Sequence, residues 1–131
     1  MAYEIPGLTI SFQTAAANAD YSAKQYYVAK LDTSGNALLP TAVTDRPVGI
    51  VQNNPANSRT ASVLVNGVSK YVAGGNIAVG DNLGLKNDGT LVKVTPGTDT
   101  TVFLVGVALE AGASGDKLTG LFDFASAGRA A

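Results

Sequence analysis

The sequence predicts an all-β fold in one domain, built as a small β-barrel or β-sandwich. Short apolar segments alternate with clusters of glycine, asparagine, aspartate and proline roughly every 8 to 15 residues, a spacing typical of such folds. Almost no segment keeps the 3.6-residue hydrophobic period of an amphipathic helix. The chain has 131 residues, of which 46% are hydrophobic, and this is enough for one globular core.

The predicted strands begin near the N-terminus. In LTISF the side chains of Leu8, Ile10 and Phe12 alternate onto one face, as in a half-buried strand. The Ala-rich stretch 14–25 is the best candidate for a short helix. The other predicted strands are apolar runs bounded by turn residues: 25–32, 37–40, 47–51, 61–65, 68–73, 82–86, 90–94, 101–110 and 117–124.

Two dipeptides give the clearest hairpin signals. Asn66-Gly67 separates ASVLV from VSKYVA, and Asp88-Gly89 separates NLGLK from TLVKV. A type I′ turn needs positive φ values, which these pairs supply. The glycine-rich run between them, AGGNIAVGD, lacks the GK[ST] and the following helix of a phosphate-binding loop, so we interpret it as turning the chain. The residues predicted to form structural turns are Asn66, Gly67, Gly74, Gly75, Gly80, Asp81, Asp88 and Gly89.

The composition excludes several classes of function. Histidine and cysteine are absent, so neither a Ser-His-Asp triad nor a Cys-ligated zinc site can form. We expect no enzyme, cofactor or metal site, because the carboxylates lie at turns and lack the order of a calcium-binding loop. The net charge is −1 and the nine basic residues are scattered, which argues against nucleic acid as a partner. No apolar run approaches the roughly 20 residues of a membrane span.

The order and spacing of these segments resemble the small capsid decoration (cement) proteins of tailed bacteriophages. The resemblance covers most of residues 5–124. It rests on the strand that begins at Pro47, the segment 61–70, the A-G-G-x-I-x-V-G-D run of 73–81, Asp88-Gly89, and the G-x-A-L-E-A run of 106–111 with Gly115-Asp116 after it.

The resemblance implies a β-barrel or β-tulip-like domain with at most one short helix and an extended N-terminal arm. We therefore expect an arm over residues 1–12, a β-rich decoration domain over 13–125 and a flexible C-terminal tail over 126–131.

The function implied by the resemblance is that of a non-enzymatic virion structural protein. Such proteins bind the outer surface of the expanded capsid, staple neighbouring subunits of the major capsid protein and often form homotrimers; they occupy the host cytoplasm during assembly. Their N-terminal arm commonly orders on binding, by adding an extended segment to a capsid sheet. The residues expected to contact the capsid are Tyr3, Ile5, Pro6, Leu8, Ile10 and Phe12. The alternative for LTISF is that it pairs within its own domain.

A small β-barrel that binds carbohydrate or another ligand is the alternative function. Its candidate residues are the five tyrosines, including the pair Tyr26-Tyr27, since aromatic rings stack on sugars. These tyrosines are dispersed along the chain and tryptophan is absent. The loops 52–59 and 95–100 are candidate sites for a cell-surface glycan. An accessory domain of an enzyme is a second alternative.

Overall fold

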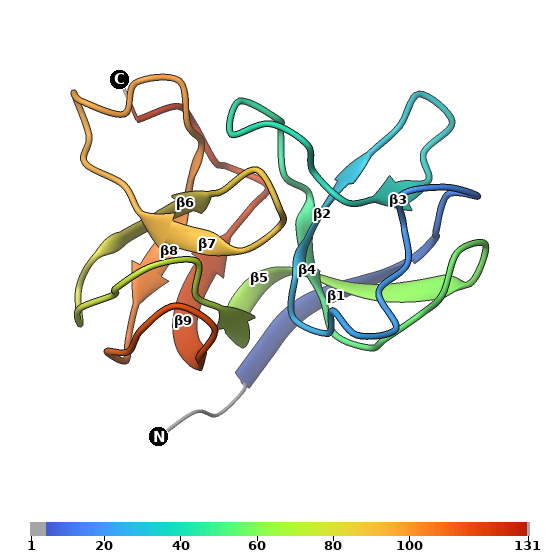
Figure 1. The fold of residues 1–131 in the computed structure, drawn as a ribbon, viewed down its shortest axis with the longest axis horizontal. Coiled ribbons are helices and arrows are strands. Elements are labelled where there is room, and N and C mark those ends of the chain that lie inside the picture. The colour runs from blue at the N-terminus through green and yellow to red at the C-terminus, as the bar shows by residue number, and fades with distance from the viewer. Residues whose placement is uncertain (1–4, 131) are drawn as a thin grey trace.

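The computed structural model describes residues 5–130, which form two β-rich lobes side by side (Figure 1). Nine strands form one curled antiparallel sheet, and residues 5–130 contain no helix, hence none that could span a membrane. The strands are β1 (Ile5–Gln13), β2 (Val28–Leu31), β3 (Ala37–Leu38), β4 (Gly49–Val51), β5 (Thr60–Val72), β6 (Asn82–Leu85), β7 (Leu91–Lys93), β8 (Leu104–Ala108) and β9 (Lys117–Asp123). The prediction of an all-β single domain is confirmed.

The long strand β5 belongs to both lobes. The sheet order is β3-β2-β4-β5-β9-β8-β6-β7, with β1 paired to β5 outside this path. The first half of β5 pairs with β4 and its second half with β9, while β1 runs along the opposite edge. We call β1 to β4 with the first half of β5 the N-terminal lobe, and the second half of β5 with β6 to β9 the C-terminal lobe.

Each lobe curls into a half-barrel. In the N-terminal lobe, Thr14 just after β1 bridges Ala37 of β3. In the C-terminal lobe, Ala73 just after β5 bridges Leu91 of β7. Each curl is therefore closed by a single bridge, and each encloses its own hydrophobic cluster.

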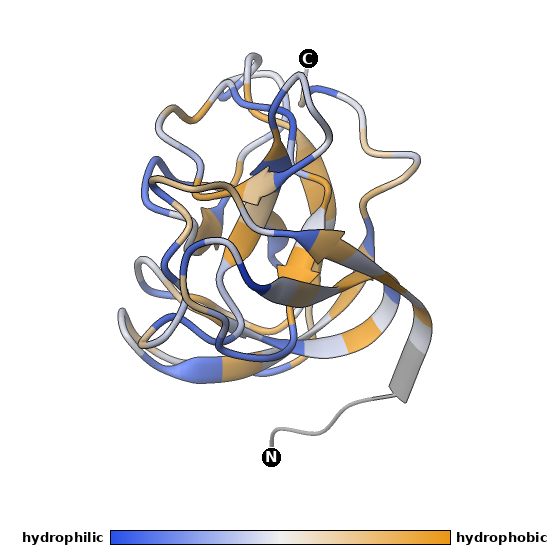
Figure 2. Ribbon diagram, turned by 90° about the vertical axis from the view of Figure 1, so that its right-hand side faces the viewer, coloured by the Kyte–Doolittle hydropathy of each residue, from blue (hydrophilic) through white to orange (hydrophobic). Residues whose placement is uncertain are grey.

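The two clusters lie on opposite faces of the layer formed by β2, β4 and the start of β5. Successive residues of a strand point to opposite faces. Thus Val51 enters the N-terminal cluster, whereas its neighbour Ile50 enters the C-terminal cluster. A layer buried on both faces requires consecutive apolar residues, as in the GIV of β4. Figure 2 shows hydrophobic residues concentrated on the strands, with hydrophilic residues mostly in the loops.

Residues 14–25 were the best candidate for a short helix, but they do not form one. Asn18 has a φ of 55°, a left-handed conformation that a right-handed helix excludes. Tyr21 is fully buried, and its hydroxyl donates a hydrogen bond to the Val28 carbonyl oxygen at 3.0 Å. Burial of this ring in the N-terminal cluster therefore outweighs the helix propensity of the alanines.

The hairpin predicted at Asn66-Gly67 is wrong, because β5 runs unbroken through this pair. The pair lies where the pairing register between β1 and β5 shifts. Gly67 has a φ of 121°, and the Asn66 side-chain oxygen accepts a hydrogen bond from the Leu8 N–H at 2.8 Å. The positive φ of Gly67 thus accommodates a β-bulge-like irregularity at the point where β5 passes from one lobe to the other. The strand does not turn back there, because hydrogen-bonded partners on both of its edges outweigh the local turn preference of Asn-Gly.

The other residues predicted to turn the chain lie between strands. Asp88-Gly89 joins β6 to β7, and Gly80 precedes β6; both glycines have a φ near 90°. Gly74 instead permits a close approach, because a Cβ there would collide with the hydroxyl oxygen of Thr90. Gly75 lies beside Gly74 in the same bend.

A flexible tail was expected over 126–131, and the structure describes residues 126–130 of it. The N–H of Leu104 donates to the Gly128 carbonyl oxygen and the N–H of Ala130 donates to that of Val102, both at 2.8 Å. Ala127 and Ala130 are buried. Residues 126–130 therefore run beside β8 as part of the C-terminal lobe.

Candidate functional site

Strand β1 pairs along one edge. Its partner is β5, and within residues 5–130 no strand pairs along its second edge before Thr14 bridges Ala37. The N–H and C=O groups of such an edge are available to an added strand. LTISF therefore pairs within its own domain, one of the two alternatives that the sequence left open, and still presents a free edge.

The apolar side chains of β1 are only partly covered. Leu8 is 49% exposed and Ile10 is 40% exposed, whereas Phe12 is half-buried against the N-terminal cluster. Ile10 pairs with Val63 and Phe12 with Ala61, both of which belong to that cluster. Ile10 and Phe12 thus share the inward face of β1, and Ile10 lies at the rim of the lobe.

The remaining residues expected to contact the capsid are described only in part. Tyr3 lies outside the described residues. For Ile5 and Pro6 the structure describes the backbone, which pairs with Val68 and Gly67 of β5.

An apolar groove of about 310 Å³ opens beside Ile10. It lies where the rim of the N-terminal lobe meets the segment that follows β9. The residues that line it are Ile10, Leu31, Arg46, Pro47, Val48, Val65, Phe124 and Ala125. Its volume lies at the lower end of the roughly 300–1,000 Å³ of ligand pockets.

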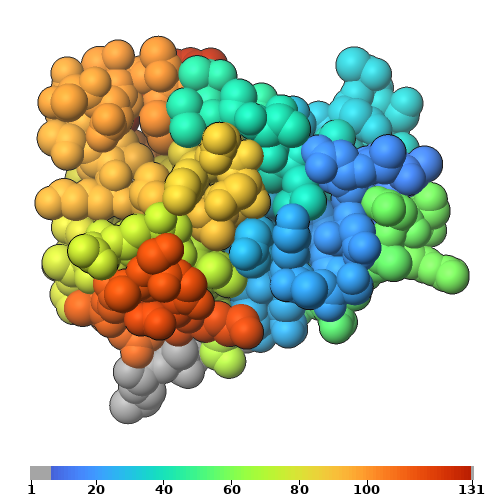
Figure 3. Space-filling view, viewed as in Figure 1, coloured from blue at the N-terminus to red at the C-terminus, as the bar shows by residue number. Residues whose placement is uncertain are grey.

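Arg46 is the one charged residue among those that line the groove, and its guanidinium is held by backbone carbonyl groups. The guanidinium donates to the carbonyl oxygens of Phe124 at 3.4 Å, Ala125 at 3.2 Å and Ala127 at 3.2 Å. Its Cζ also lies 5.0 Å from the centre of the Phe103 ring. Arg46 therefore clamps the two lobes together, and the teal segment that carries it lies at their boundary in Figure 3.

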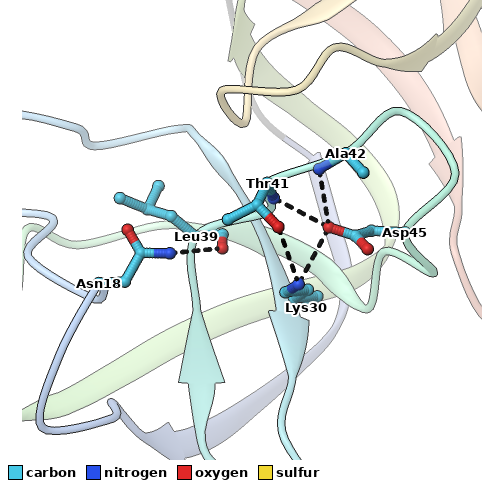
Figure 4. A network of polar contacts seen from close by, with 6 residues as sticks. All are labelled: Asn18, Lys30, Leu39, Thr41, Ala42 and Asp45. Carbon is cyan, nitrogen blue, oxygen red and sulfur yellow. Dashed lines mark hydrogen bonds and ion pairs between the residues drawn. The ribbon is translucent and has the colours of Figure 1, made fainter.

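Asp45 fixes the loop that carries Arg46. Its Oδ2 accepts hydrogen bonds from the N–H groups of Thr41 at 2.9 Å and Ala42 at 3.1 Å, and from Lys30 Nζ at 3.0 Å (Figure 4). Burial favours the neutral acid, but these three donors together hold the pKa of Asp45 below its ordinary value. The wall of the groove formed by this loop is thus held in place by an ionised carboxylate.

Residues 5–130 contain no cluster of three side chains that could hold a metal ion. The acidic residues at the turns bond nearby groups instead. Asp81 Oδ2 accepts from the Ala78 N–H at 2.8 Å, and Asp88 Oδ1 accepts from the Thr90 N–H at 3.0 Å. These contacts account for the two carboxylates as local turn chemistry.

Among residues 5–130, the four tyrosines that a sugar-binding site could use are not gathered on one surface, and Tyr26 packs against the C-terminal cluster. Tyr21 and Tyr71 are buried. Tyr27 lines a separate polar hollow of about 350 Å³, together with residues such as Asn54 and Lys117. Its ring packs against the N-terminal cluster and lies 5.8 Å from Lys24 Nζ, so part of its surface is already covered.

Reasoning from the sequence missed the groove and the Arg46 clamp. The partners of Arg46 lie 78 to 81 residues further along the chain, so no local pattern connects them. An arginine directly before a proline and an apolar run was the signal present, and it is not specific.

Comparison with known proteins places the chain in a family. Residues 6–124 match the sequence pattern of the family described as phage cement protein. The solved structure of the N base of head fiber gp8.5 from bacteriophage phi29 is similar, with a TM-score of 0.62 and 22% sequence identity over 89% of this chain and 96% of that chain. No curated protein matches significantly. The likeness to the phi29 structure shows a shared fold, and the match over nearly all of the sequence shows that this chain belongs to the phage cement protein family.

Proposed function

We propose that this protein is a non-enzymatic structural protein of a phage virion, which binds the outer surface of the expanded capsid and staples neighbouring subunits of the major capsid protein. The observation that carries the proposal is the family match over residues 6–124, which supports a structural role in the virion. A staple needs no reactive group, which agrees with a chain that lacks histidine and cysteine.

In this proposal β1 supplies the capsid contact. Leu8 and Ile10 expose apolar surface beside a free strand edge. Strand addition at such an edge takes affinity from main-chain hydrogen bonds and specificity from alternate side chains. The proposed contact residues are Tyr3, Ile5, Pro6, Leu8, Ile10 and Phe12.

We further propose that the protein acts as a homotrimer, assembles in the host cytoplasm and remains on the outer surface of the capsid. Only 15% of the residues are charged, which limits repulsion between copies. Several weak contacts made at once by linked copies multiply a modest affinity. Sedimentation equilibrium of the purified protein tests the oligomer, and a monomer at all concentrations would contradict it.

The decisive experiment is co-sedimentation of the purified protein with expanded heads and, separately, with unexpanded procapsids. Saturable binding to expanded heads alone is the expected result. Leu8→Asp should weaken this binding, because it places a charge on the exposed contact strand. A point variant is a cleaner probe than deletion of residues 2–12, since β1 is part of the folded sheet.

Absence of binding to either particle, by protein with a normal melting transition, would contradict the proposed function. The sugar-binding alternative would then be tested at the polar hollow beside Tyr27, by titration with a panel of glycans.

A further inference from the structure

We infer that β1 accepts a strand of the capsid protein along its free edge, and that an uncharged apolar side chain of that strand enters the groove beside Ile10. The inference rests on the proposed function and deepens it. It reverses the direction of strand addition implied by the family resemblance. This chain receives a strand on an edge that is already folded, instead of donating an arm that orders on binding.

Three strands, β1, β3 and β7, each pair with only one other strand of the sheet, and single bridges partly cover the second edges of β3 and β7. β3 has two residues, and β7 has three and ends in Lys93. Short edges and edge lysines are the devices by which proteins prevent unwanted strand pairing. β1 has nine residues, and the exposed stretch 8–13 contains neither a charged residue nor a proline. Pro6 and the register shifts of β1 lie toward its N-terminal end, so residues 9–13 form the longest unprotected stretch in these three strands, which indicates that a partner normally covers it.

The groove lies beside that edge of β1. Ile10 of β1 and Leu31 of β2 both line the groove and are 40% and 39% exposed. A strand added beside β1 would direct every second side chain toward the face on which Ile10 lies. The added strand can therefore place a side chain in the groove while its backbone pairs with β1.

The lining of the groove determines which kind of side chain it accepts. Seven of the eight lining residues are uncharged, and the guanidinium of Arg46 donates to carbonyl oxygens of the segment that follows β9. A basic side chain would lose its hydration there and be repelled by Arg46, and an acidic one would compete with three carbonyl oxygens for the guanidinium. An aliphatic or aromatic side chain would bury apolar surface against Ile10, Leu31 and Val48. The groove therefore selects an apolar side chain.

The first test is a pair of matched variants, Ile10→Asp in the groove and Val79→Asp in the C-terminal lobe. Val79 is also an exposed aliphatic residue, at 67% exposure, and does not line the groove. We expect Ile10→Asp to weaken binding to purified expanded heads by about tenfold or more, and Val79→Asp to leave it unchanged. Val79→Asp should keep the wild-type melting temperature within a few degrees. Ile10→Asp should lower it further, because Ile10 is partly buried, so binding is compared at a temperature at which both variants are fully folded.

Ile10→Leu serves as a conservative variant that should retain head binding. If Ile10→Asp binds heads as tightly as the wild type, the inference is overturned while the proposed function stands. If the wild type itself binds no heads, the proposed function fails first, so the two failures are distinguishable.

The second test addresses the backbone edge by hydrogen–deuterium exchange of the wild-type protein, free and bound to expanded heads. The amides of residues 8–13 should exchange more slowly in the bound state, because an added strand bonds those that point to the free edge. The amides of β7, the comparison edge, should keep their exchange rates. Binding without any protection over residues 8–13 would rule out strand addition.

Discussion

The two lobes share β5 but are built in different ways. The N-terminal cluster has one fully buried ring, Tyr21, with the rings of Phe12 and Tyr27 partly buried against it. The C-terminal cluster contains stacked rings: Phe122 lies 5.7 Å from Tyr71, edge to face, and 5.6 Å from Phe124. The N-terminal lobe also has the long free edge of β1 and the rim of the apolar groove.

This difference indicates a division of roles. The C-terminal cluster has more buried residues and more buried rings than the N-terminal cluster, so the C-terminal lobe should supply more of the stability. The N-terminal lobe, with the smaller core and an open edge, supplies the surface that we propose for the capsid. The Arg46 clamp joins the two and would transmit the rigidity of one lobe to the contact surface of the other.

The largest expected effect is the contrast between two phenylalanines. Phe122→Ala in the C-terminal core should lower the free energy of unfolding by about 3–5 kcal/mol, because it removes a buried ring and leaves a cavity. Phe12→Ala in β1 should cost about 1 kcal/mol, since that ring is only half-buried. Urea unfolding of the two variants measures the contrast. Equal losses would show that the lobes contribute equally.

The second prediction breaks the connection between the lobes. Arg46→Ala should lower the free energy of unfolding by about 2 kcal/mol, since it removes three hydrogen bonds and the contact with Phe103. Arg46→Lys should recover little of this loss, because an ammonium lacks the planar fork of a guanidinium. Unfolding curves of both variants provide the test. Full recovery by lysine would mean that charge alone holds the lobes together.

The third prediction concerns the loop of the N-terminal lobe and its dependence on pH. Asp45→Asn should cost about 1.5 kcal/mol at pH 7, because the carboxylate accepts three hydrogen bonds, one from Lys30. Because folding lowers the pKa of Asp45, its contribution is complete above the unfolded pKa of about 3.9 and is lost as the pH falls through the folded pKa.

The difference in unfolding free energy between the wild type and Asp45→Asn should therefore be constant above about pH 5 and shrink below about pH 4. Thermal melting from pH 2.5 to 7 measures it. A difference that stays constant over this range would exclude the carboxylate charge as its source.

The smallest expected effect compares one buried tyrosine from each lobe. The Tyr21 hydroxyl donates to the Val28 carbonyl oxygen, whereas the Tyr71 hydroxyl has no hydrogen-bond partner among residues 5–130. Tyr21→Phe should therefore cost about 1 kcal/mol, while Tyr71→Phe should leave stability unchanged or raise it slightly. Paired unfolding curves test the difference. A loss in Tyr71→Phe equal to that in Tyr21→Phe would show that its hydroxyl is bonded.

The sequence by itself determined the features that depend on neighbouring residues. Alternation in LTISF marked β1, and the Asp88-Gly89 pair marked the turn between β6 and β7. The absence of histidine and cysteine removed most catalytic chemistry, and the order of the segments already resembled the phage cement proteins.

Only the tertiary structure decided the features that depend on distant residues. Strand partners on both edges kept β5 straight through Asn66-Gly67, and burial of Tyr21 prevented a helix over 14–25. Arg46 donates hydrogen bonds to carbonyl oxygens of residues 124, 125 and 127, and these contacts hold together two walls of the groove that lie far apart in the sequence. Local preferences amount to about 1 kcal/mol or less per residue, so several long-range contacts made together outweigh them, and a single sequence does not reveal which distant residues will meet.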